Sequence, residues 1–188
     1  LHLCNKNMEN METTKIKDKN VLLAEVCMAA KYEGGLIKTH YTEHEQTNPD
    51  TKSQICTALA RSFADIGDIV SGKDLYLGYD DEEKKQRKEL EQKLKGIFEK
   101  IHEGLSESAK KHYTDNKDPN FFKLREDWWY ANRSTVWEAI TCDAPHTAQY
   151  FGGTCGGEQT ETLAKNKCRC DDVNIVPTYF DYVPQYLR

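Results

Sequence analysis

The sequence has no long hydrophobic run. Its longest apolar stretch, residues 21–30, is interrupted by Glu25, whereas a membrane-spanning helix needs about 20 consecutive apolar residues. Hydrophobic residues make up 38% of the 188 residues, charged residues make up 30%, and the mean hydropathy is -0.80. The composition therefore predicts a polar surface and no direct insertion of this segment into a membrane.

The sequence also has no excess of positive charge. Lys and Arg number 26 against 31 for Asp and Glu, which gives a formal net charge of -5, and the two signs are mixed in both halves. Nucleic-acid-binding domains usually carry a basic face. We therefore expect no nucleic-acid partner.

Neither end has the signals of a complete chain. The sequence starts at Leu1 without a methionine or a leader of basic and then apolar residues, and residues 179–188 form an aromatic run. We expect the sequence to be a piece of a longer protein.

Cysteine, by contrast, is abundant for a domain of this size. The number is odd, so one cysteine is expected to pair outside this sequence or to remain a free buried thiol. Such abundance, mostly without close pairs, indicates an oxidising compartment and disulfides. The disulfide candidates are Cys4, Cys27, Cys56, Cys142, Cys155, Cys168 and Cys170.

Cysteine spacing gives a first hypothesis for the pairing. A bridge between Cys168 and Cys170 would be strained, so each is predicted to pair elsewhere. The nearest candidate partners for these two cysteines are Cys142 and Cys155. The alternative is a zinc site made by these four thiolates. Structural zinc sites usually take ligands in pairs two to four residues apart, and here only Cys168 and Cys170 lie close together.

Hydrophobic periodicity predicts several amphipathic helices. The first covers residues 21–32 and is expected to end at Gly34-Gly35, with a loop over residues 36–52.

A second predicted helix covers residues 53–70 and ends at Gly72. A third begins near Asp80, where acidic residues favour the helix N-terminus, and residues 106–117 are expected to form a polar connection after it. The predicted inner stripe of the third helix is Leu90, Leu94, Ile97, Phe98, Ile101 and Leu105.

The most aromatic helix is predicted over residues 121–142, with Asp118 as its N-cap. Apolar rows on more than one side indicate a central helix. The predicted core scaffold consists of Trp128, Trp129 and Trp137 on this helix and Phe63 on the second one.

Together these patterns predict a mostly α fold, in which long amphipathic helices pack as a bundle with disulfide-pinned loops. The cysteine-rich loop is expected over residues 143–176, and the one strand pairing considered is a short hairpin within residues 163–176.

Residues 40–44, His-Tyr-Thr-Glu-His, fit the pattern of inverted zinc peptidases, in which two histidines bind zinc and the glutamate activates water. The motif needs a helix inside an apolar scaffold. Here His40, Glu43 and His44 lie in a predicted polar loop, so a chance match is the favoured interpretation.

The densest basic cluster lies at the start of the third helix and consists of Lys84, Lys85, Arg87 and Lys88. Exposed cations on one helix turn can hold sulfated glycans or phosphates. The alternative is a solvated face with acidic residues one turn away, such as Glu83 with Arg87.

Several long blocks carry a specific resemblance. Residues 22–34 read LLAEVCMAAKYEG and residues 59–76 read LARSFADIGDIVSGKDLY; residues 124–142 contain REDWW, ANR and TVW; residues 167–170 read KCRC, and residues 176–188 read VPTYFDYVPQYLR. Together they resemble a Duffy-binding-like domain of the alpha class, from the erythrocyte membrane protein 1 family of Plasmodium falciparum.

The resemblance implies a cysteine-rich, mostly helical adhesion domain of three subdomains. It places the domain on the extracellular face of the infected erythrocyte, within a longer membrane-anchored variant antigen. Residues 1–52 would belong to the first subdomain and residues 53–188 to an incomplete second one. The implied partners are a host cell-surface receptor, a sulfated glycan or blood-group sugar, and antibodies.

Three hypotheses follow for function. The first is a non-enzymatic module that binds a host receptor in cytoadherence or rosetting and needs no cofactor. The second is a structural and antigenic domain that supports a neighbouring receptor-binding domain. The third, a zinc-dependent hydrolase, rests only on His40, Glu43 and His44.

Overall fold

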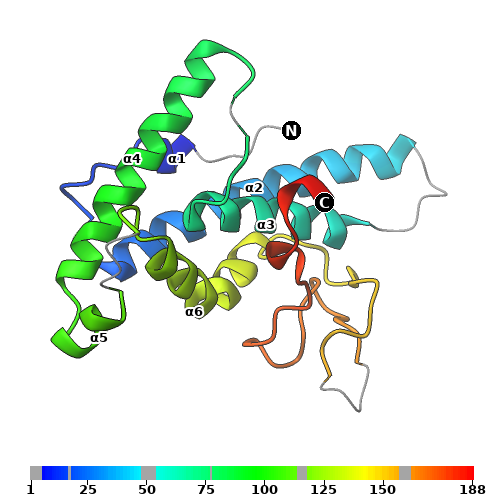
Figure 1. Ribbon diagram of the computed structural model, residues 1–188. Helices are drawn as coiled ribbons and strands as arrows, with labels where there is room; N and C mark the ends of the chain where they lie inside the picture. The colour runs from blue at the N-terminus through cyan, green and yellow to red at the C-terminus, as the bar shows by residue number, and fades with distance from the viewer. Residues whose placement is uncertain (1–5, 17, 48–53, 77, 114–117, 157–161) are drawn as a thin grey trace.

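The computed structural model describes residues 6–16, 18–47, 54–76, 78–113, 118–156 and 162–188 (Figure 1). The described elements are the α-helices α1 (Lys6–Glu9), α2 (Lys19–Thr47), α3 (Ile55–Ser71), α4 (Asp81–Glu103), α5 (Glu107–His112) and α6 (Phe122–Ile140), and the short 3-10 helices η1 (Phe180–Tyr182) and η2 (Gln185–Leu187). Within these ranges the only β pairing is an isolated bridge between Asn166 and Arg169. The predicted mostly helical fold is confirmed, and the considered hairpin reduces to that bridge.

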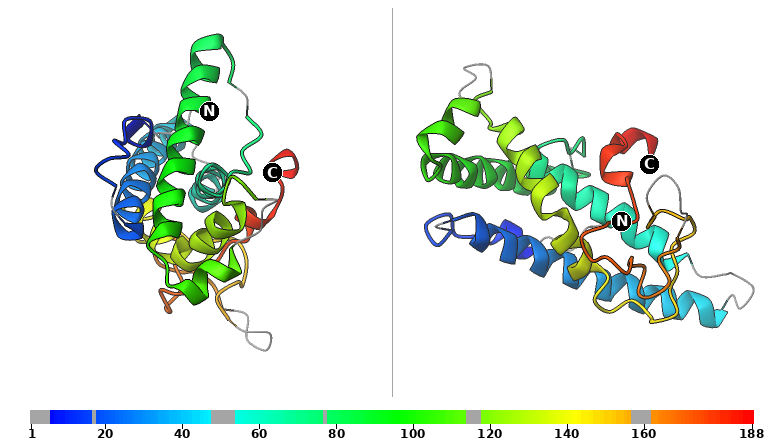
Figure 2. Two further views of the ribbon diagram at one scale, coloured as in Figure 1. Left: turned by 60° about the vertical axis from the view of Figure 1, so that its left-hand side comes forward. Right: turned by 90° about the horizontal axis from the view of Figure 1, so that it is seen from below.

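Helix α6 is the central element. It contacts α2, α3 and α4, as the views in Figures 1 and 2 agree. Phe63 of α3 lies between two of its indoles, with ring centroids 5.0 Å from Trp129 and 5.2 Å from Trp137. Trp128 instead meets Phe98 of α4 edge-on at 6.0 Å. Tryptophans on different sides of one helix therefore join the other helices into a single core.

The helix termini follow local sequence signals. Asp80 accepts a hydrogen bond from the Glu83 amide at the start of α4, and Gly72 ends α3 in the left-handed conformation at φ 76°. Helix α6 is slightly shorter than the predicted range 121–142, since it begins at Phe122 and ends at Ile140. The N-cap residue is Phe121 and not the predicted Asp118, but the Asp118 carboxylate accepts from the amides of Phe122 and Lys123 at 2.9 and 3.0 Å.

The prediction that the first helix ends at Gly34-Gly35 is wrong, and so is the loop predicted after it. Helix α2 continues to Thr47. A Cβ on Gly34 would lie 1.9 Å from the carbonyl oxygen of Ile140, so the end of α6 packs directly on the α2 backbone. The missing side chain serves this close helix contact, and tertiary packing overrides the stop signal.

The connection predicted over residues 106–117 also contains a short helix, α5. Ser106 caps it by accepting a hydrogen bond from the Ala109 amide at 3.3 Å. Residues 114–117 lie outside the described part of the chain. The polar composition concealed α5 because a helix of six residues has no room for an apolar stripe.

The final segment of the chain packs against α3 through η1, as Figure 1 shows in red. Arg133 of α6 binds the buried carboxylate of Asp181 at 2.8 Å, and the indole of Trp129 donates to the same carboxylate at 3.0 Å. The predicted division into subdomains at residues 52 and 53 stays a prediction. Helix α2, from the predicted first part, packs on α3 and α6 of the second.

None of the described helices is long and apolar enough to cross a membrane.

Candidate functional site

The predicted basic cluster lies on the first turns of α4, but its members face different surroundings. Lys84 and Lys85 are exposed and reach Asp81 and Glu89 only at 3.5 and 3.9 Å. Lys88 is exposed and makes no ion pair or hydrogen bond with any described residue. These lysines are therefore available to a ligand.

Arg87 does not join them on the surface. Its guanidinium donates to Asp74 at 2.6 Å, and its side chain is only 18% exposed. It also lies over the ring of Tyr76, with 4.9 Å from the guanidinium carbon to the ring centroid. The predicted four-cation face is thus corrected to three lysines, because the Asp74 carboxylate draws the arginine inward.

The segment that receives Arg87 is itself held in place from the far end of the chain. Gln185 donates to Asp74 at 3.1 Å and accepts from the Leu75 amide at 2.8 Å. Residues 73–76 are therefore held between α4 and the C-terminal segment.

A pocket of about 680 Å³ lies between α4, the chain after α3 and the start of α6. Its aromatic wall is formed by Tyr76 and Phe122, which are 41% and 42% exposed. The lining residues are Ile69, Gly72, Asp74, Tyr76, Lys84, Arg87, Lys88, Leu90, Glu91, Leu94, Asn120 and Phe122. Apolar and aromatic walls with a few charged groups are typical of ligand pockets.

The charges around this pocket do not cancel. Asp74 is paired with Arg87, and the other lining carboxylate, Glu91, is paired with the buried Arg125 at 2.6 Å. Of the lining lysines, Lys88 has no described carboxylate partner, and Lys84 reaches only the exposed Asp81, at 3.5 Å. We call this site the α4 pocket, and its electrostatics favour an anionic ligand.

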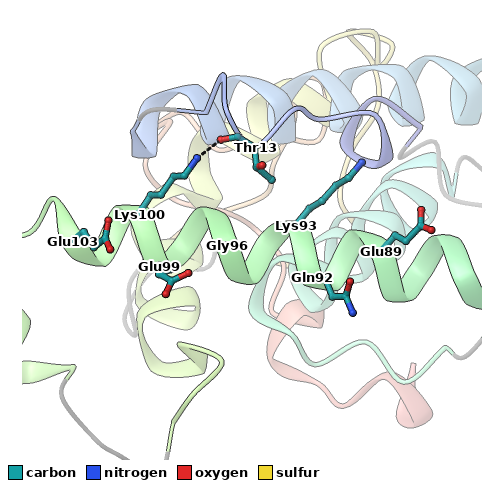
Figure 3. A pocket seen from close by; sticks show the side chains of 8 residues that line it. All are labelled: Thr13, Glu89, Gln92, Lys93, Gly96, Glu99, Lys100 and Glu103. Carbon is teal, nitrogen blue, oxygen red and sulfur yellow. Dashed lines mark hydrogen bonds between the residues drawn. The ribbon is translucent and has the colours of Figure 1, made fainter.

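A second pocket of about 600 Å³ lies on the other side of α4 (Figure 3). Two lysines cross it toward the N-terminal segment, where Lys100 donates to the carbonyl of Thr13 at 2.6 Å and Lys93 donates to that of Glu9. Figure 3 shows the Lys100 contact as a dashed line. Because both ammonium groups bind backbone, these cations hold the N-terminal segment on α4 and are not free for a ligand.

The zinc-peptidase motif lies on a helix and not in the predicted loop, since α2 continues past it. His40 and Glu43 are 77% and 72% exposed, with 3.7 Å between the His40 Nδ1 and Glu43 Oε2 atoms. The part of the chain that the structure describes contains no group of three or more His, Cys, Asp or Glu residues that could hold a metal ion. The motif is a solvated helix face and lacks the apolar scaffold of a catalytic zinc site.

Two disulfides are present among the described residues. Cys56 of α3 pairs with Cys168, and Cys155 pairs with Cys170. Of the two nearest partners expected for Cys168 and Cys170, Cys155 does pair with Cys170, whereas Cys142 pairs with neither. Cys168 instead pairs with the distant Cys56, because the fold brings the 168–170 segment back over α3. Cys168 and Cys170 do pair elsewhere than with each other, as predicted.

Two further cysteines, Cys27 and Cys142, are free thiols, the first half-buried and the second exposed. Burial, together with the nearby carboxylate of Glu138, raises the pKa of the Cys27 thiol to about 11. Cys4, the remaining candidate, lies outside the described residues.

Sequence reasoning did not single out Asp74, Tyr76, Phe122 or Gln185 as parts of a site. Residues 74–76, Phe122 and Gln185 lie far apart along the chain, so periodicity within one element could not join them. The only local signal was an aromatic residue, Tyr76, two positions after the charged Asp74.

The whole chain, residues 1–188, matches the family model of the Duffy binding domain. No curated protein matches it. Among solved structures, it is similar to the N-terminal NTS-DBL1-alpha and CIDR-gamma double domain of the PfEMP1 protein from the Plasmodium falciparum varO strain. That match has 42% identity and a TM-score of 0.68, and it covers 88% of this chain and 22% of the other.

The chain is also similar to the ICAM-1-binding DBLbeta domain of PfEMP1 IT4var13, at 31% identity and a TM-score of 0.68, over 100% of this chain and 39% of that one. The same domain bound to ICAM-1 gives 30% identity and a TM-score of 0.65, covering 99% and 40%. The chain therefore spans two fifths or less of these solved chains.

Proposed function

The chain belongs to the Duffy binding domain family, and from this premise we propose that it is a receptor-binding module of a variant surface antigen displayed on infected erythrocytes. The family consists of adhesion domains and not of enzymes. A related DBLbeta domain binds ICAM-1. The family therefore favours the adhesion hypothesis over the zinc-hydrolase hypothesis.

We propose the α4 pocket as the contact surface, with an anionic glycan of the host cell as its ligand. The observation that carries this proposal is the pair of lysines, Lys84 and Lys88, beside a half-exposed aromatic wall. Ammonium groups bind sulfate or carboxylate, while Tyr76 and Phe122 offer apolar area for sugar rings. Binding energy would come from these few anchors and not from total charge, which is negative.

The test compares two charge-matched double variants of the 188-residue chain. Lys84→Ala with Lys88→Ala removes the pocket lysines, whereas Lys85→Ala with Lys95→Ala removes two exposed lysines of the same helix that do not line the pocket. Binding to immobilised heparin and to red cells is measured for each. We expect the pocket variant to bind about tenfold more weakly or worse, since each lost contact contributes about 1 kcal/mol.

Equal losses in both variants would refute the pocket and leave only general electrostatic attraction. No binding by the unmodified chain to heparin or to red cells would instead favour the structural and antigenic hypothesis, in which a neighbouring domain binds the receptor. A Phe122→Ala variant separates the aromatic contribution, because it leaves the charge unchanged.

A further inference from the structure

The two free cysteines of the described chain lie on α2 and just after α6, the two helices that pack together most extensively. Cys27 is on α2, and Cys142 is in the turn that follows α6. Both line one pocket of about 520 Å³, together with Glu138 and Arg169. Residues 115 positions apart in the sequence are thus brought to the same small cavity.

Contacts around this cavity bring the two segments close together. The position of Gly34 shows that α2 and the end of α6 are in backbone contact, since an added Cβ would lie 1.9 Å from the Ile140 oxygen. Glu138, one helical turn before Cys142, lines the same cavity as Cys27, and burial together with the Glu138 carboxylate raises the pKa of the Cys27 thiol. Cys27 therefore faces the last turn of α6, where Cys142 follows.

The turn that carries Cys142 is anchored to the segment that already holds both disulfides. Lys167 donates to the Cys142 carbonyl at 2.7 Å, and Arg169 donates to Thr141 at 2.7 Å and to the Glu138 carbonyl at 2.6 Å. The thiol of Cys142 itself is exposed. An exposed side chain in a turn can rotate toward the cavity while its backbone stays anchored.

We propose that Cys27 and Cys142 form a third disulfide, which joins α2 covalently to the end of α6. The oxidant is a disulfide donor of the secretory route, either oxidised glutathione or an oxidised thiol oxidoreductase. This proposal does not depend on which receptor the domain binds.

The exchange has two steps. The thiolate of Cys142 meets the donor first because it is exposed; it attacks one donor sulfur and releases the other as a thiol. Cys27 then loses its proton and attacks the Cys142 sulfur, which releases the second donor thiol. The two cysteines lose two electrons and two protons, and the donor disulfide gains both as two thiols.

The assignment also resolves the odd number of cysteines. Two disulfides use Cys56 with Cys168 and Cys155 with Cys170, and the third uses Cys27 and Cys142. Of the seven cysteines, Cys4 is then the one without a partner within this chain.

Non-reducing peptide mapping of the chain, folded with oxidised glutathione, tests the proposal. Trypsin combined with a protease that cleaves before aspartate isolates each cysteine, since Asp143 separates Cys142 from Cys155 and Arg169 separates Cys168 from Cys170. We expect residues 20–31 to be linked to residues 134–142 and to separate when reductant is added. Alkylation of both thiols in the denatured, unreduced chain, or a link from either one to Cys4, would overturn the proposal.

Variants give an independent readout. Cys27→Ser should leave the Cys142 thiol reactive toward maleimide, and Cys142→Ser should do the same for Cys27 after denaturation. Cys4→Ser is the matched control and should leave the linked peptide unchanged. The oxidised chain should melt about 5–10 °C above the Cys27→Ser/Cys142→Ser variant, and equal melting temperatures would contradict a closed bridge.

Discussion

The fully buried guanidinium of Arg125 donates to both carboxylate oxygens of Glu91, at 2.6 and 2.9 Å. The same group donates to the carbonyls of Val70 and Ile69 at 2.7 and 3.1 Å, where α3 ends. One side chain of α6 thereby ties α3 to α4 behind the α4 pocket. The Glu91 carboxylate cannot then neutralise the pocket lysines.

We predict that Arg125→Met destabilises the chain by about 3–5 kcal/mol, because it leaves buried carbonyls and a carboxylate without their donor. Urea unfolding followed by circular dichroism measures the loss. The exposed ion pair of Lys73 with Glu126 is the control, since its double alanine variant should cost less than about 1 kcal/mol. Similar losses in the two variants would show that Arg125 has no special structural role.

Two glycines in helices should respond to alanine in opposite directions. Gly34→Ala places a methyl group against the Ile140 carbonyl and should cost about 3 kcal/mol or more, because the contact is with backbone. Gly96→Ala, in the middle of α4, meets nothing within 4 Å and should stabilise the chain by about 0.5–1 kcal/mol. Thermal unfolding distinguishes them, and a neutral Gly34→Ala would refute the close packing of α2 on α6.

The carboxyl of Asp68 should give the stability of the fold a distinct pH dependence. Burial raises its pKa to about 6, although Arg188 opposes the shift. Its folded pKa lies above the unfolded one, so the folded chain binds more protons between these values. This group's contribution to stability is therefore complete below about pH 4 and is lost as pH rises to about 6.

Comparison with Asp68→Asn isolates this effect from other carboxylates. The unfolding free energy of the variant relative to the unmodified chain should increase between about pH 4 and 6 and remain level above that range. Arg188→Gln removes the cation that lowers the pKa of Asp68, so only burial and the neighbouring carboxylates would act on this pKa. The pKa should therefore rise further, and the range should extend to higher pH. A difference that is constant with pH, or that decreases, would contradict the shift.

The two observed disulfides should contribute unequally to stability. The Cys56–Cys168 bridge closes 112 residues and the Cys155–Cys170 bridge closes 15. Loop-closure entropy predicts losses of about 5 and about 3 kcal/mol for the paired alanine variants. Denaturant unfolding under non-reducing conditions measures both, and an equal or reversed order would count against the entropic explanation.

The sequence alone determined the features that depend on neighbouring residues. The cap at Asp80, the end of α3 at Gly72 and the burial of the three tryptophans follow from signals within one or two helical turns. The family could also be identified from sequence blocks. These signals are local, so they can be read directly from the sequence.

Only the tertiary structure decided the features that depend on distant partners. Gly34 continues α2 because Ile140 packs on it, Arg87 turns inward because Asp74 is held by Gln185, and Cys155 meets Cys170 through loop folding. The α4 pocket likewise requires segments from three parts of the chain. Packing and charge pairing across long separations leave no period in the sequence, and only the folded chain brings these groups together.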